Sequence, residues 1–324
     1  LSVGNTGKTM HINCPFCGEG KRRLYLYPDT EQYHCFHCGA HGNAVSLYAR
    51  RTGLSYANAY HELEADRMLH FPLPNVPKTP EREPASIEKR DAVYRAMLQL
   101  LPLSAEHHQN LLHRGLSEQK IRGNSYRTLA DGKELRDSIA AQLSARFDLN
   151  GIPGFYFRDG TWRLCAYSGL LIPVRDADGR MQGIQIRRDS AERMKYVWLS
   201  GAGRPCGTPA RSWVHVTGNR AKATAVITEG PLKGDAASAL SGDTLFLCVP
   251  GVSAIKYLPE TLKNLHLTAV YEAFDMDKLR NPQVVAARKR LRQMIADCGL
   301  PCRTLLWNET CNGIDDYLAA QKIC

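Results

Sequence analysis

The sequence predicts a modular chain of α/β and α+β structure, with a small zinc-binding head, a mixed α+β region and a parallel α/β domain. Three observations predict it: two pairs of cysteines near the amino terminus, a proline-rich segment behind them, and apolar strands that alternate with helical stretches in the last third. A chain of 324 residues is long enough for two or three domains. We expect domains over residues 1–70, 87–221 and 222–324, with a linker over residues 71–86.

The charge balance favours a polyanionic partner. Lys and Arg number 42 against 32 Asp and Glu, a formal net charge of +10. Nucleic acid is the first candidate, although charge alone does not decide between it and an ordinary basic surface. The sequence has no apolar run of the ~20 residues that a spanning helix needs and no secretory pattern. We therefore expect a cytoplasmic protein without a membrane partner.

Four cysteines of the head have the spacing of a zinc site. Cys14 and Cys17 form one Cys-x2-Cys pair, Cys35 and Cys38 form a second, and seventeen residues separate the pairs. This spacing brings four thiolates into a tetrahedron around Zn²⁺ and leaves no open position, which is typical of a structural site. The other seven cysteines are scattered through apolar contexts, which is typical of buried thiols. The nearby histidines are interpreted as surface or nucleic-acid contacts: His34, His37 and His41.

The region behind the linker begins with helices and continues with strands. Helical apolar spacing runs from Ile87 to Leu112, a turn is expected at His113–Gly115, and Ser117 is a typical helix start. Period-two segments follow at Gly169–Val174 and Met181–Arg188. The linker before it is defined by its prolines, which remove backbone donors and stiffen the chain. They are Pro72, Pro74, Pro77, Pro80 and Pro84.

The last third has the pattern of a parallel α/β sheet, because four apolar strands alternate with helical stretches. The expected strands are 224–228, 244–249, 267–274 and 304–307, and the expected helices are 235–240, 255–262 and 282–295. Ligands of such sheets bind beyond the carboxyl ends of the strands. Acidic residues follow two of these ends, Glu229 after the first strand and Asp275 and Asp277 after the third. The basic run Arg288–Arg292 is interpreted as a solvated helix face.

Several segments resemble bacterial DNA primases of the DnaG type. Cys35–Val45 and Leu54–Ala59 are similar to the end of their zinc ribbon, and Leu111–Ile121 and Gly179–Ser200 are similar to segments of their polymerase core. The glutamate at one strand end and the Asp-x-Asp motif at another resemble the acidic centre of the Toprim fold. That fold is shared by primases, topoisomerases and certain nucleases.

The resemblance implies roles for individual residues. Glu229, Asp275 and Asp277 are the candidate catalytic residues and the candidate ligands of Mg²⁺ or Mn²⁺, with Glu229 open between metal binding and proton transfer. Arg187 and Lys195 would face the template and the incoming nucleotide, and guanidinium and ammonium groups suit phosphate. The remaining candidate contacts to nucleic acid or nucleotide are Arg188, which strand alternation places on the face opposite Arg187, and Lys233.

Two departures from the family pattern stand out. Cys17 occupies a position that is commonly histidine in the family, which favours a phage or mobile-element lineage. Lys233 stands where familiar cellular primases have an aspartate. The roles of three further acidic residues stay open: Asp235, Asp315 and Asp316.

The resemblance predicts a DNA primase that makes short RNA primers on a single-stranded DNA template from nucleoside triphosphates, with structural Zn²⁺ and catalytic Mg²⁺ or Mn²⁺. A replicative helicase is a further candidate partner. Two alternatives stay open at this point. One is a Toprim metal-dependent nuclease, and the other is a non-catalytic zinc-ribbon adaptor that binds single strands.

Overall fold

A computed structural model describes residues 9–18, 20–28, 31–67, 82–190, 194–252, 254–276, 282–308 and 310–321. The chain divides into two compact units, Leu1–Thr79 and Pro80–Cys324. The division falls within the expected linker 71–86, most of which lies outside the described residues, and the finer domain limits stay predictions. Within the described ranges, every helix is too short or too polar to cross a bilayer.

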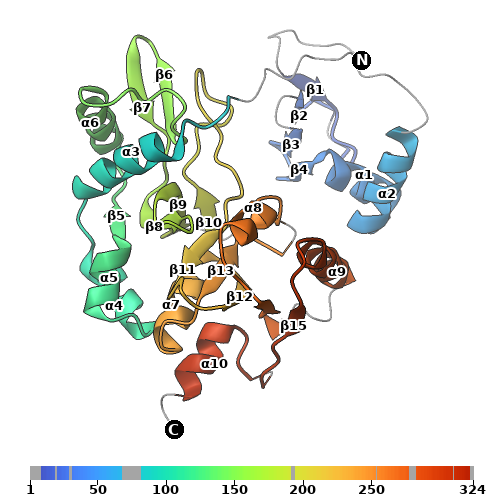
Figure 1. The fold of residues 1–324 in the computed structure, drawn as a ribbon. Coiled ribbons are helices and arrows are strands. Elements are labelled where there is room, and N and C mark those ends of the chain that lie inside the picture. The colour runs from blue at the N-terminus through green and yellow to red at the C-terminus, as the bar shows by residue number, and fades with distance from the viewer. Residues whose placement is uncertain are drawn as a thin grey trace. The chain divides into compact units, whose positions relative to one another are not determined.

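The first unit is a four-stranded antiparallel sheet followed by two helices (Figure 1). The elements are β1 (Met10–Ile12), β2 (Leu24–Tyr27), β3 (Gln32–Cys35), β4 (His41–Asn43), α1 (Ala44–Thr52) and α2 (Tyr56–Arg67). The Asn43 side chain caps α1, because its oxygen accepts a hydrogen bond from the Ser46 backbone N–H. Few residues form the buried core: Cys14, Leu24, Tyr33, Cys35 and Ala40. So small a core needs further stabilisation.

The second unit begins with three helices, α3 (Ile87–Gln99), α4 (Ala105–His113) and α5 (Glu118–Asn124). Each starts at a serine whose side chain accepts a hydrogen bond from the backbone three residues on: Ser86, Ser104 and Ser117. The start at Ser117 is confirmed. The continuous helical stretch from Ile87 to Leu112 is wrong, because Pro102 lies between α3 and α4 and cannot donate a helical hydrogen bond.

An antiparallel sheet follows in the order β10-β9-β8-β5. Its strands are β5 (Arg127–Leu129), β8 (Gly169–Arg175), β9 (Met181–Arg188) and β10 (Tyr196–Trp198). This region also contains helix α6 (Lys133–Ser144) and a hairpin of β6 (Phe155–Arg158) and β7 (Thr161–Leu164). The predicted strands at 169–174 and 181–188 are therefore confirmed. One face of the sheet packs Ile184 and Ile186 against Val93 and Met97 of α3. We refer to this region as the platform.

The last third forms a five-stranded sheet in the order β11-β13-β12-β14-β15. The strands are β11 (His215–Thr217), β12 (Thr224–Glu229), β13 (Phe246–Val249), β14 (Ala269–Glu272) and β15 (Cys302–Thr304). Strands β12 to β15 pair in parallel, as predicted. The last strand lies at 302–304, so its expected position at 304–307 is wrong except for Thr304. Strand β11 adds an antiparallel edge that the sequence pattern did not reveal. The edge strand is only three residues long and begins before residue 222, where we expected this domain to start.

Helices cover both faces of this sheet (Figure 1). Helices α8 (Leu258–Lys263) and α9 (Pro282–Asp297) share a core with Ala225 and Ile227 of β12, and α7 (Pro231–Leu240) and α10 (Ile314–Gln321) pack on the opposite face around Val226. Alternate residues of one strand thus serve two cores, which explains its continuous apolar sequence.

The basic run on α9 is not simply a solvated face. Glu272 at the end of β14 is fully buried, and Arg288 and Arg292 both form ion pairs with its carboxylate. The Thr304 hydroxyl donates to the same carboxylate at 2.6 Å. Burial opposes ionisation of Glu272, but these donors outweigh it and hold its pKa below the ordinary value. The interpretation of Arg288–Arg292 as solvated is wrong for Arg288, whose side chain is only 12% exposed, because a buried carboxylate needs cationic partners. Arg292 pairs with the same carboxylate, although 47% of its side chain is exposed.

The close packing of α7 on β13 gives a test of the fold. A Cβ atom at Gly234 would lie 2.0 Å from the sulfur of buried Cys248. We expect Gly234→Ala to lower the free energy of unfolding by about 1–3 kcal/mol through overpacking. Cys248→Ala combined with Gly234→Ala should recover much of that loss, measured by denaturant unfolding of the two single variants and the double variant. Strictly additive losses would contradict the packing described.

Candidate metal centres and nucleic-acid interface

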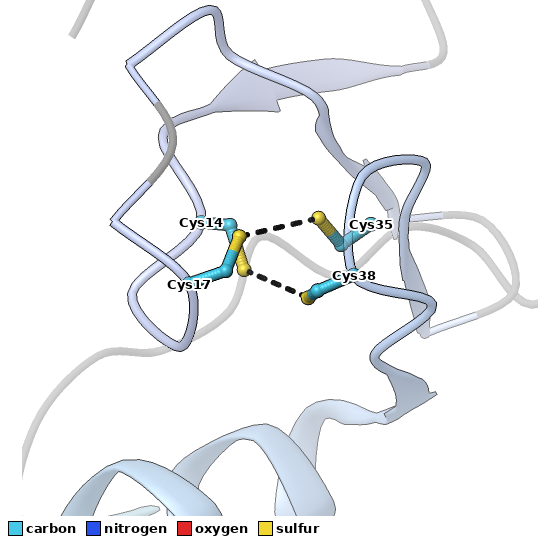
Figure 2. Close-up of side chains that lie close together, drawn as sticks. All are labelled: Cys14, Cys17, Cys35 and Cys38. Carbon is cyan, nitrogen blue, oxygen red and sulfur yellow. Dashed lines mark hydrogen bonds between the residues drawn. The ribbon is translucent and has the colours of Figure 1, made fainter.

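The four cysteines of the first unit converge from two separate turns (Figure 2). Their sulfur atoms all lie within 4.8 Å of one another, with 3.8 Å between Cys14 and Cys38 and 4.0 Å between Cys17 and Cys35. Four sulfurs at about 2.3 Å from a zinc ion would lie roughly 3.8 Å apart along the edges of a tetrahedron. The four-cysteine arrangement therefore fits structural Zn²⁺.

The cysteine environment favours the thiolate form that zinc needs. The backbone N–H of Cys38 is the main group that lowers the pKa of Cys35, to about 7, against the opposing effect of burial. Two peptide N–H groups and two neighbouring sulfurs contribute in all. A metal held by these cysteines would join the loop between β1 and β2 to the end of β3 and the turn that follows it. It would thereby compensate for the small core.

A cavity of about 480 Å³ in the second unit gathers most of the predicted acidic centre. Glu229 reaches it from the last position of β12, and Asp275 reaches it from the segment behind β14. Strands β12 and β14 are parallel neighbours, so their carboxyl ends meet at one edge of the sheet. Asp315 and Asp316, in the first turn of α10, line the same cavity. Asp277 lies outside the described residues.

The turn behind Glu229 brings the start of α7 into the cavity. Gly230 has φ 88°, a left-handed conformation that glycine adopts without strain, and Pro231 occupies the first turn of the helix. Gly230, Leu232 and Lys233 all line the cavity. The amino-terminal end of a helix carries partial positive charge and free N–H groups, which suit a phosphate.

Lys233 lies among these carboxylates. Its ammonium forms an ion pair with the Asp275 carboxylate, and both side chains are largely buried. Arg114 provides a second cation, with its guanidinium 3.7 Å from one oxygen of Asp315. The other oxygen of Asp315 is buried and has no hydrogen-bond partner among the described residues. Burial raises the pKa of Asp315, and the charge of Lys233 opposes that rise.

Asp235 does not reach the cavity but lies in a buried network that supports it. His215 and Thr217 donate to one carboxylate oxygen at 3.1 and 2.6 Å, and the Tyr126 hydroxyl donates to the other. His215 is held in one tautomer, since its other ring nitrogen accepts the Arg175 backbone N–H at 3.0 Å. Burial disfavours the charged form of Asp235, but His215 and the hydroxyl donors outweigh it and lower its pKa.

The basic strands divide between two faces, as alternation predicts. Arg187 pairs with Tyr196 across β9 and β10, and Tyr196 and Gln185 line the acidic cavity. Arg187 is two residues from Gln185 and so points from the same face. The Nε of Arg187 is buried without a hydrogen-bond partner in the described part of the chain. Arg187 itself is not among the lining residues.

Arg188 and Lys195 lie away from that cavity. Arg188 stacks over the Tyr167 ring at 4.5 Å and lines a second hollow with Asp131 and Arg136. Lys195 is exposed, and its carbonyl accepts the Arg188 backbone N–H at 2.9 Å. The structure thus brings Lys233, Glu229 and Asp275 together, but does not place Lys195 with them.

Two family models match the chain. The CHC2 zinc finger model, the zinc ribbon of DnaG, matches residues 1–76, and a domain of unknown function (DUF3854) matches residues 213–323. Among curated proteins, the DNA primase of Chlamydia pneumoniae is 26% identical over 208 residues, which cover 61% of this chain and 34% of that protein. The DNA primase of Escherichia coli (strain K12) is 31% identical over 132 residues, or 37% of this chain and 22% of that protein. The chain is a relative of the DnaG-type DNA primases.

Solved primase structures have the same fold. The zinc-binding and RNA polymerase domains of the Aquifex aeolicus primase match with a TM-score of 0.56 at 16% identity, over 99% of this chain and 77% of that chain. A DnaG primase catalytic domain bound to ssDNA matches with a TM-score of 0.53 at 15% identity, over 73% of this chain and 79% of that one. The chain spans about a third of the length of the first curated primases that it matches.

Sequence reasoning missed part of this primase-like cavity. Arg114 stands in the Leu111–Ile121 segment that resembles the primase core, and its position inside that segment was the available signal. Gln185, Tyr196 and Asn312 come from strands and a loop far apart in the sequence. Nothing in their local pattern indicated that they would meet, because the meeting depends on how the platform packs on the second sheet.

The zinc ribbon gives a direct prediction. We expect one Zn²⁺ per chain in protein purified without chelator, measured by elemental analysis. Cys38→Ser should remove the ion and lower the melting temperature of the first unit, since the small core depends on it. Cys206→Ser, at an exposed cysteine of the second unit, is the matched control and should leave the zinc content at one. Zinc retained in full by the Cys38 variant would contradict the site.

Proposed function

We propose that this chain is a DNA primase that synthesises short RNA primers on single-stranded DNA from nucleoside triphosphates. The observation that carries the proposal is the single cavity in which Glu229 and Asp275, from parallel strand ends, face Arg114 and Lys233. Carboxylates suit a divalent metal and the cations suit phosphates, and nucleotidyl transfer needs both. The similarity of the chain to DNA primases supports the reaction class.

The carboxylates fit Mg²⁺ or Mn²⁺. These ions prefer oxygen ligands, and Mg²⁺ commonly takes one or two carboxylates together with substrate phosphates. Glu229 and Asp275 supply such a pair, and the hydrogen-bond-deficient oxygen of Asp315 is a further acceptor for a cation. Asp277 is the third proposed ligand. When bound, the metal would lower the pKa of a hydroxyl and neutralise charge on phosphate oxygens.

The reaction joins a primer 3′-oxygen to the α-phosphorus of the incoming nucleotide. The bond from that phosphorus to the bridging oxygen breaks, pyrophosphate leaves with the electron pair, and the hydroxyl proton is released. Arg114 can donate two parallel hydrogen bonds to a phosphate, and Lys233 supplies a compact charge beside Asp275. The start of α7 adds its partial positive charge. These groups oppose the negative charge that develops on the phosphates.

The template would lie along the platform. Arg187 points from the face that also carries Gln185 and Tyr196 into the cavity, and an aromatic ring next to cationic groups suits a stacked base and its phosphate. The zinc ribbon and a replicative helicase are proposed to assist at the template, and the enzyme is proposed to act in the cytoplasm. A phage or mobile-element origin rests on Cys17 alone.

The acidic centre gives the principal test of this function. Asp275→Asn keeps the size of the side chain but removes its charge, so priming on single-stranded DNA should fall by about 10² or more. Glu229→Gln should behave similarly. The assay is gel analysis of labelled short products with nucleoside triphosphates and Mg²⁺ or Mn²⁺. Asp243→Asn is the matched control: this residue pairs with Lys120 outside the cavity and has φ 60°, which asparagine tolerates.

The same assay separates the alternatives. New short products that need nucleotides, with an intact template, support the primase. Shortening of the template without nucleotides, abolished by Asp275→Asn, would support a metal-dependent nuclease instead. Single-strand binding with neither activity would support the adaptor. Melting curves of each variant show whether lost activity reflects lost folding.

Template binding gives a second test. We expect the affinity for single-stranded DNA to fall steeply with salt, since each phosphate contact releases counterions. Arg187→Ala and Lys195→Ala should each weaken binding and lower the slope of log affinity against log salt by about 1 for a lost contact. Arg158→Ala, at an exposed arginine of the β6–β7 hairpin, is the control. Fluorescence anisotropy at several salt concentrations measures this, and unchanged binding in both variants would exclude the platform as the template surface.

A further inference from the structure

One cation is built into the acidic centre. Lys233 is the third residue of α7, and this helix starts at Pro231, two residues after Glu229. Its ammonium contacts Asp275, with 20% of the lysine side chain and 10% of the aspartate side chain exposed. If the lysine moved into solvent, a largely buried carboxylate would lose this ion pair, which is costly.

The ammonium also lies close to the second carboxylate of the cavity. A Cβ atom at Gly313 would lie 3.3 Å from the Lys233 Nζ and 2.5 Å from the Oδ1 of Asp315. Both atoms therefore surround the same small space. That Oδ1 is the buried oxygen without a hydrogen-bond partner, on a residue only 8% exposed. An unpartnered buried carboxylate oxygen indicates a position for a cation.

We propose that the Lys233 ammonium permanently holds the position in which a second divalent ion would bridge Asp275 and Asp315, so that the centre binds a single Mg²⁺ or Mn²⁺. The single ion takes the Glu229 side of Asp275. A second divalent ion next to a fixed positive charge is strongly repelled at such short range. The inference concerns the cavity of the proposed primase function and rests on that function for its chemical meaning.

A tethered cation changes what the centre requires. The positive charge of Lys233 is present at any concentration of free metal. Its ammonium has three N–H donors, so it can donate to a phosphate oxygen while it still pairs with Asp275. Arg114 on the other side of Asp315 completes a pair of fixed charges. One divalent ion, Lys233 and Arg114 would then together neutralise the negative charge of the triphosphate.

The test counts bound Mn²⁺ on the zinc-loaded full chain by electron paramagnetic resonance, without nucleotide. Only ions lost in Asp275→Asn are counted, which removes weak surface binding. We expect one such ion in the wild type. Lys233→Asp should bind two, since a carboxylate replaces the ammonium. Lys233→Met should bind its Mn²⁺ at least tenfold more tightly, because the ammonium that pairs with Asp275 is removed. Lys120→Met, which removes a lysine–aspartate pair elsewhere, should match the wild type.

The outcomes separate this inference from the primase function. A wild type that binds two such ions, or none, overturns the inference, as does unchanged Mn²⁺ affinity in Lys233→Met. The methionine variant covers the case in which Lys233→Asp does not fold, as judged by its melting curve. Priming by a protein with two ions would leave the function standing and remove the inference. One bound ion without any priming would support the inference about Lys233 and contradict the proposed primase function.

Discussion

The parallel pairing of β12 with β14 is the constraint on which the candidate site depends. The two strands are separated by about forty residues of sequence, but their hydrogen bonds set Ile227 opposite Glu272. Glu229 and Asp275 then follow within a few residues, so the acidic side chains meet because the ladder fixes the register of their strands. A shift of one residue would send Glu229 to the other face of the sheet. The buried Glu272 carboxylate joins β14 to α9 through Arg288 and Arg292 and to β15 through Thr304.

The two units are stabilised in different ways. The second unit buries apolar residues on both faces of its two larger sheets, whereas the core of the first unit has few buried residues, of which two are cysteines. Hydrophobic burial can stabilise the larger unit alone, but the smaller one relies on a metal to close its turns. A metal in the ribbon therefore has a structural role, whereas a metal at the acidic cavity would have a catalytic one.

The sequence predicted the parallel strands, the cysteine site and the acidic strand ends because each has a local signal. Apolar runs mark β12 to β14, whereas β15 lies just before the run that we expected to form it. Paired cysteines mark the ribbon. It did not predict β11, which has three residues and no distinct pattern, or the break at Pro102 within a helical periodicity. It also could not show that Lys233 contacts Asp275, or that Arg188 stacks on Tyr167. Those contacts arise from tertiary packing, which no short segment encodes.

The network around Asp235 has a consequence for how this region can vary. Asp235 and Lys233 are two positions apart on α7, one anchored to buried partners and the other pointing into the cavity. An insertion or deletion between Glu229 and Asp235 would turn one of them away by roughly 100° per residue, whatever amino acid were added. The length of this stretch should therefore be constant among functional homologues even where its residue types differ. Surface loops of the same unit can tolerate insertions and deletions.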